Sequence, residues 1–135
     1  MSCAKELLLE YLAVFRVPEK AASLFAPDGV LELPYLASLN MPTRLTGPVA
    51  IVKYIAGLMA MMPDLAFSNP VIRMESEFQV FAEYEVHTVA VHTSRPFHQL
   101  YFGWLMCDEE RKIKVLREAL NTIEVVRALL REGFN

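Results

Sequence analysis

Residues 96–121 read PFHQLYFGWLMCDEERKIKVLREALN, and this stretch says more about the structure than any other part of the chain. Two apolar runs flank the charged turn DEER, which is the pattern of two antiparallel strands joined by a short hairpin. In the second run, alternation with period two places Glu118 on the same face as Leu116 and Leu120. A carboxylate on an apolar face needs a partner that neutralises it, or a ligand cavity whose low polarity raises its pKa. The pattern leaves both alternatives open.

The rest of the chain places helices first and strands afterwards, with short turns between the strands. The predicted elements are helices over 4–15, 19–25 and 48–62, a strand over 30–33, an almost uncharged loop over 35–46, strands over 71–74, 78–93, 97–107 and 112–121, and a last helix capped by Thr122 and ended by Gly133. This order predicts an α+β fold with an antiparallel meander. The strand over 78–93 is longer than usual, so we expect it to bend or to carry a bulge.

Composition limits the possible classes of protein. A chain of 135 residues forms one domain, residues 1–135, and 54% hydrophobic residues indicate an internal cavity, a subunit interface or both. The net charge of −3, without a cluster of Lys and Arg, argues against a nucleic-acid partner. No apolar run approaches the roughly 20 residues of a membrane-spanning helix. Cys3 and Cys107 have no zinc spacing and no evident disulfide framework, which favours a cytoplasmic location.

Five segments in order carry a resemblance to a known family, and together they cover nearly the whole chain. They are LFAPDGVLELP, GPVAIVKYIAGL, MPDLAFS, RPFHQLYFGWL and KIKVLREALN. The series resembles the SnoaL-like branch of the nuclear transport factor 2-like superfamily. This resemblance implies a cone in which a curved antiparallel sheet wraps around the N-terminal helices and leaves a deep apolar pocket. Within that branch, the ending LREALNTIEVVRAL is similar to that of the phenazine-biosynthesis A/B proteins.

The resemblance transfers catalytic residues only in part. Compared with ketosteroid isomerases, Tyr11 matches the oxyanion tyrosine, but the general-base aspartate falls on Leu33 and the second acid falls near Gly103. Steroid isomerisation of that type is therefore not expected.

Two other families point to Glu118. In limonene epoxide hydrolases this position is a catalytic aspartate, although the arginine and the other aspartate fall on Glu85 and His87. In the phenazine A/B proteins the matching glutamate is an acid/base residue, although their helix histidine has no counterpart in residues 52–54.

We therefore expect a pocket that binds a small, apolar, cyclic metabolite. As an enzyme the protein would carry out cofactor-free isomerisation, cyclisation, dehydration or hydration; the alternative is a non-catalytic ligand-binding or assembly module of the same fold. Glu118 would move the proton, while His87 and Glu85 would set its charge. Strand alternation places these two residues in solvent, whereas the resemblance turns them inward, and both orientations remain open.

The expected ligand-binding residues come from the helices, the oily loop and the strand over 97–107, and Tyr11, Gln99 or Tyr101 would hydrogen-bond a substrate carbonyl. The full set is Tyr11, Phe15, Tyr35, Met41, Tyr54, Leu58, Met62, Gln99 and Tyr101. The loop over 35–46 should cover the pocket mouth. His87 and His92 face opposite ways on a regular strand, so no metal site is expected, and no cofactor motif is present.

The strand over 97–107 is apolar on both faces. Gln99 and Tyr101 share the face assigned to the pocket, and the opposite face carries Leu100, Phe102, Trp104 and Met106. Helices can cover only one face of so small a sheet. The sequence therefore predicts a homodimer formed through the outer face.

Overall fold

The helices form close to their predicted positions in the computed structural model, which describes residues 2–130. They are α1 (Cys3–Val14), α2 (Pro18–Ser23), α3 (Pro48–Met61) and α4 (Thr122–Leu129). The side chain of Ser2 caps α1 by accepting a hydrogen bond from the Lys5 amide. The cap of α4 is Asn121 rather than Thr122, because the Asn121 side chain accepts from the Ile123 amide at 3.0 Å. The predicted end at Gly133 lies outside the described residues.

The strands form a six-stranded mixed sheet with the order β2-β1-β6-β5-β4-β3. Their bounds are β1 (Phe25–Glu32), β2 (Arg44–Thr46), β3 (Phe67–Glu75), β4 (Gln79–Ala90), β5 (Arg95–Cys107) and β6 (Ile113–Ala119). The meander from β3 to β6 is antiparallel as predicted, but β1 pairs with β6 in parallel. The segment 35–46, predicted as a loop, instead contains regular secondary structure. A 3₁₀ helix, η1 (Pro34–Leu39), precedes β2, which pairs with β1.

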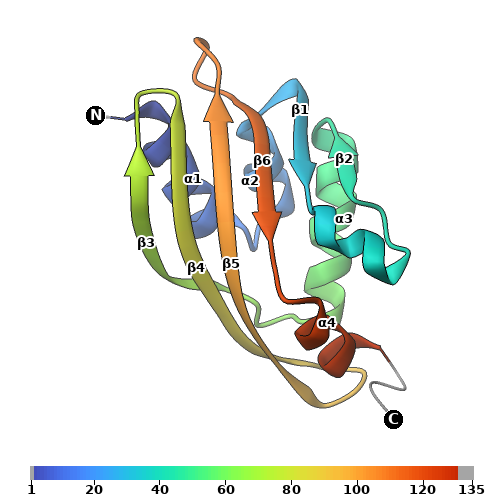
Figure 1. Ribbon diagram of the computed structural model, residues 1–135. Coiled ribbons are helices and arrows are strands. Elements are labelled where there is room, and N and C mark those ends of the chain that lie inside the picture. Colours follow the sequence, from blue (N-terminus) through green and yellow to red (C-terminus); the bar gives the residue numbers. More distant parts are fainter. Residues whose placement is uncertain (1, 131–135) are drawn as a thin grey trace.

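The sheet curves strongly, and Figure 1 shows its long strands β4 and β5 bending together around the helices. The bulge expected in the long strand is not in its pairing with β5, which runs in unbroken register from Gln79 to Ala90. The register shifts lie instead between β3 and β4, at Ser68/Val71 and Ile72/Met74. Bulges of this kind increase the local twist, so they help to curve the edge of the sheet.

Helices α1, α2 and α3 cover one face of the sheet, which is the inner face (Figure 1). Along β5, Gln99, Tyr101 and Leu105 are buried on this face. Their neighbours Leu100 and Phe102 point away from the helices and are 43% and 40% exposed. The predicted assignment of the two faces of β5 is therefore confirmed, and the α+β class with one curved sheet over N-terminal helices is confirmed as well.

The start of α1 meets the end of β5 through the two cysteines, which the sequence analysis had left unrelated. Both are buried, and the Cys107 thiol donates to the Cys3 sulfur with 3.1 Å between the Sγ atoms. Burial, followed by the contact with Cys3, raises the pKa of Cys107 to about 12. Among residues 2–130, no helix combines the length and the apolar character needed to cross a membrane.

Candidate active site

Glu118 lies on the inner face of β6, buried with 4% of its surface exposed. It faces inward because β6 alternates, as the apolar neighbours predict, and it sits opposite Gly103 in the β5–β6 register. The Tyr84 hydroxyl donates a hydrogen bond to Glu118 Oε2 at 2.6 Å. Burial raises the pKa of Glu118 to about 7, while the Tyr84 hydrogen bond acts in the opposite direction.

Three more tyrosines interact electrostatically with this carboxyl. Tyr11 comes from α1, Tyr54 from α3 and Tyr101 from β5. Burial raises the pKa of each, and the negative charge of Glu118 adds to the rise in all three cases. Their hydroxyls therefore remain protonated, and they are hydrogen-bond donors at any physiological pH.

The Tyr11 hydroxyl has no hydrogen-bond partner within the described part of the chain, although it is completely buried. An unsatisfied buried hydroxyl costs on the order of 1–3 kcal/mol, so such groups are uncommon in folded proteins. A donor left free beside a buried carboxyl is the arrangement expected where a ligand oxygen completes the hydrogen bond.

Aromatic rings pack against these groups. Phe67, at the start of β3, makes edge-on contacts with Phe15, Tyr84 and Tyr101 at centroid distances of 4.8, 5.3 and 5.5 Å. The Tyr84 and Tyr101 rings stack at 5.7 Å. This packing holds the side chains around Glu118 in fixed positions.

Chemically, the cluster combines one group that can exchange a proton near neutral pH with neutral hydroxyl donors. A carboxyl with a pKa of about 7 can act as either general acid or general base. In the described residues, no three His, Cys, Asp or Glu side chains are placed to hold a metal ion.

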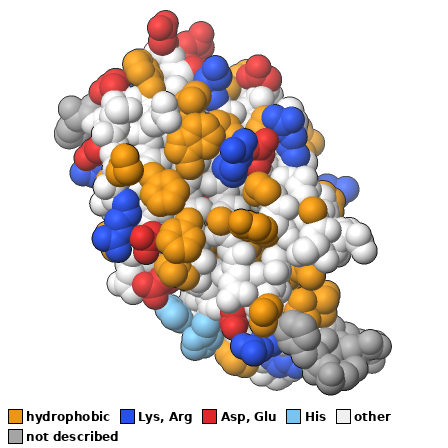
Figure 2. All heavy atoms as spheres, in the orientation of Figure 1, with side chains coloured by type: hydrophobic (Ala, Val, Ile, Leu, Met, Phe, Trp, Pro, Cys, Tyr) orange, Lys and Arg blue, Asp and Glu red, His pale blue; other side chains and the backbone are white. Residues whose placement is uncertain are grey.

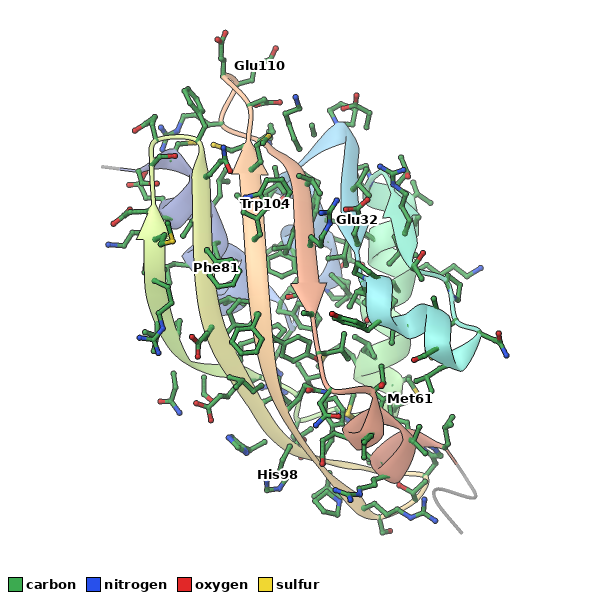
Figure 3. The ribbon with its side chains drawn as sticks, in the orientation of Figure 1. Glu32, Met61, Phe81, His98, Trp104 and Glu110 are labelled. Atoms are coloured by element: carbon green, nitrogen blue, oxygen red, sulfur yellow. The ribbon has the colours of Figure 1, made fainter. Side chains whose placement is uncertain are left out.

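Glu85 and His87 are not brought to Glu118. They lie on the outer face of β4, where His87 Nε2 is 2.9 Å from Glu85 Oε1 and His87 Nδ1 is 3.3 Å from His98 Nδ1. Figure 2 shows histidine side chains on this exposed face, and Figure 3 labels His98 there. Strand alternation was thus the better guide, because the unbroken β4–β5 register contains no bulge that could turn them inward.

Other expected binding residues divide into two groups. Phe15 and Met62 are buried in the hydrophobic core of the molecule, and Leu58 packs against this core. Tyr35 and Met41 are 61% and 36% exposed. Tyr35 lines a groove of about 400 Å³ on the outer side, together with Leu100 and Phe102 among others, so the structure does not place it beside Glu118.

Gln99 is buried on the inner face, but both ends of its amide are already engaged. Its Oε1 accepts from the Asn121 amide at 2.7 Å, and its Nε2 donates to the Asn121 carbonyl at 3.0 Å. The side chain therefore fastens β5 to the start of α4. The amide nitrogen has a second hydrogen, so a hydrogen bond from Gln99 to a substrate carbonyl stays a prediction.

Tyr84 is the important residue that the sequence analysis missed. It directly precedes Glu85 on β4, whereas the resemblance to epoxide hydrolases pointed to Glu85 and His87. Alternation along β4 buries Val80, Ala82 and Tyr84 together, so the same rule that placed Glu118 inward also identifies the tyrosine facing it.

Comparison with solved structures decides the fold. A protein from Bacillus subtilis, provisionally assigned as an isomerase, matches with a TM-score of 0.84 at 24% identity over 96% of this chain and 94% of its own. A ketosteroid isomerase-like protein from Catenulispora acidiphila, in complex with trimethylamine, matches with a TM-score of 0.78 at 16% identity over 93% and 92% of the two chains. The chain has the nuclear transport factor 2-like fold.

A phenazine biosynthesis-related protein from Pseudomonas aeruginosa has this nuclear transport factor 2-like fold too, with a TM-score of 0.77 at 18% identity over 94% of this chain and 84% of its own. No family model matches the sequence, and no curated protein matches it significantly. The resemblance drawn from the five sequence segments is thus confirmed at the level of the fold.

Proposed function

We propose that the protein binds a small, apolar, cyclic metabolite beside Glu118 and carries out cofactor-free acid/base chemistry on it. The reaction class is isomerisation, cyclisation, dehydration or hydration. Proteins with this fold include a polyketide cyclase candidate from Xanthomonas campestris and a pinacolase from Penicillium brevicompactum, which supports this range of chemistry.

One observation carries the proposal: a buried carboxyl with a pKa of about 7 lies near a buried hydroxyl that has no partner in residues 2–130. Glu118 would remove a proton from a carbon or hydroxyl of the substrate and return it elsewhere. Tyr11 would donate to the carbonyl oxygen on which negative charge develops. The surrounding aromatic rings exclude water, so both interactions act in a medium of low polarity.

The experiment begins by identifying the small molecule that co-purifies with the protein, using mass spectrometry of the denatured sample. Turnover of that compound, or of its close analogues, is then measured for Glu118→Gln. The expected loss is about 10²- to 10⁴-fold in kcat with the fold intact, because Gln keeps the shape and removes the proton. Glu109→Gln, in the exposed turn before β6, is the matched control and should retain full activity. A fully active Glu118→Gln protein would refute the acid/base role.

A second candidate is non-catalytic binding of a small organic cation, such as a tertiary amine. It is favoured by a specific feature: within the described residues no basic side chain pairs with Glu118, while tyrosine rings surround it. A carboxylate next to aromatic rings can bind a cationic amine, because the amine pairs with the charge and makes cation–π contacts with the rings. Calorimetric titration with trimethylamine tests this candidate. Binding that is lost in Glu118→Gln, without any turnover, would favour it over catalysis.

A further inference from the structure

The position of Tyr84 relative to Glu118 depends on a glycine in the strand between them. Tyr84 is on β4 and Glu118 is on β6, so β5 separates the two strands in the sheet. In the β4–β5 register Ala82 pairs with Gly103, and in the β5–β6 register Gly103 pairs with Glu118. The Tyr84 hydroxyl must therefore cross the inner face of β5 near Gly103 to reach the carboxyl.

Gly103 leaves the space that this crossing requires. A Cβ atom built on Gly103 would overlap the Tyr84 ring, with the nearest approaches to the hydroxyl oxygen and to the two ring carbons Cζ and Cε1. The distance from this Cβ to Cζ would be 2.8 Å, which is shorter than the contacts that real Cβ atoms make. The ring itself is held by its stack on Tyr101 and by the edge of Phe67. A side chain at position 103 would thus displace the hydroxyl from Glu118.

The hydrogen bond is directed to one carboxyl oxygen only. Tyr84 donates to Oε2 at 2.6 Å, and no donor in the described residues reaches Oε1. A hydrogen bond of this length, between two buried groups, fixes the carboxyl plane and favours its ionised form. The oxygen that remains is the one available to take a proton.

We propose that Tyr84 is a positioning residue for Glu118: its hydroxyl holds Oε2 and leaves Oε1 as the reactive oxygen. In this proposal Gly103 is the residue that leaves space for the Tyr84 ring. Tyr84 does not itself exchange the proton, because burial and the charge of Glu118 raise its pKa well above its ordinary value. The inference deepens the proposed function, since a reactive Oε1 matters only if Glu118 acts on a ligand.

The test follows the titration of Glu118 by carboxyl-carbon NMR of the ligand-free full chain, with the resonance assigned by its absence in Glu118→Gln. Tyr84→Phe removes the hydrogen bond that stabilises the carboxylate. The Glu118 pKa should therefore rise by about one pH unit above its wild-type value. Tyr101→Phe is the matched control, because it removes a neighbouring buried hydroxyl that is not bonded to Glu118, and it should shift the pKa much less.

Gly103→Ala provides the second arm. It should raise the Glu118 pKa in the same direction as Tyr84→Phe by displacing the hydroxyl, and it should add little further in the double variant. An unchanged or lowered pKa in Tyr84→Phe would overturn the positioning role. Additive rises would overturn the role of Gly103. These outcomes need no substrate, so they are independent of whether Glu118→Gln loses turnover, which tests the proposed function itself.

Discussion

At the scale of single residues, the molecule keeps a carboxyl group where an apolar side chain would be expected. Glu118 accepts a hydrogen bond from Tyr84, and the buried hydroxyl of Tyr11 has no hydrogen-bond partner within residues 2–130. Both features are unfavourable for the ligand-free fold, because one buries a charge and the other buries an unpaired donor. Departures of this kind are concentrated at sites of function.

The burial of Glu118 predicts a pH-dependent stability. Folding raises its pKa from 4.5 to about 7, so the native state binds this proton more tightly than the unfolded chain does. The resulting stabilisation is fully present below the lower value and is lost as the pH rises through the upper one. The loss amounts to roughly 3 kcal/mol.

Denaturant unfolding of wild-type protein and Glu118→Gln, at about pH 4 and about pH 8, measures this loss. Between the lower and the higher pH, the wild type should lose more unfolding free energy than the variant does. Glu109→Gln should follow the wild type at both values, because its side chain is exposed. Parallel behaviour of wild type and Glu118→Gln would mean that this carboxyl titrates normally in the fold.

At the scale of elements, patterns within one segment were predictable and pairings between distant segments were not. Alternation assigned the inner and outer faces of β5 and β6, and helical spacing located α1 and α3. The parallel pairing of β1 with β6 joins segments far apart in the chain, so no local pattern encodes it. Strand β2 has three residues, which is too few for a period to appear.

Candidate site residues follow the same division. Alternation placed Glu118 and Tyr101 on the buried strand faces, and Tyr11, which the resemblance to ketosteroid isomerases indicated, is buried on α1. The resemblance to epoxide hydrolases drew attention to Glu85 and His87, yet their strand faces follow the local alternation. The engagement of Gln99 by Asn121 depends on how α4 meets β5, which only the folded chain defines.

The junction between β5 and α4 should depend on that amide. Gln99→Ala leaves the Asn121 amide and carbonyl without their partner, which is expected to cost about 1–3 kcal/mol in the free energy of unfolding. Gln79→Ala is a matched control, because the Gln79 amide accepts one hydrogen bond, from Trp104 Nε1, at an exposed position. Thermal denaturation should show the larger loss for Gln99→Ala. Equal losses would indicate that the Asn121 contacts are not important for stability.

At the scale of the whole molecule, one face of the sheet carries helices and the other carries exposed apolar side chains. Figure 2 shows these side chains gathered over β4, β5 and β6, and Figure 3 shows Phe81 and Trp104 among them. The Phe81 and Phe102 rings stack at 6.5 Å, and the Arg117 guanidinium lies over the Trp104 ring at 5.5 Å. A group of exposed apolar side chains of this kind is typical of a protein–protein interface.

We therefore propose that two copies of the chain associate through this outer face, which includes Leu100, Phe102, Trp104 and Met106. Sedimentation at micromolar concentration should give a dimer, and Phe102→Glu should shift it to monomer by placing a charge in the apolar contact. Val49→Glu changes an equally apolar side chain that is 87% exposed on α3, and it should leave the dimer intact. A wild-type protein that sediments as a monomer would contradict the interface.

The proposals for the site all require that the fold hold Glu118 as a buried carboxyl able to exchange a proton near neutral pH. Carboxyl-carbon NMR of the wild-type chain, titrated from acid to alkaline pH, measures this directly. We expect a midpoint of about 7 for Glu118, because burial raises its pKa and the Tyr84 hydrogen bond only partly opposes this rise. A midpoint near 4.5, the ordinary value for a glutamate in water, would contradict it.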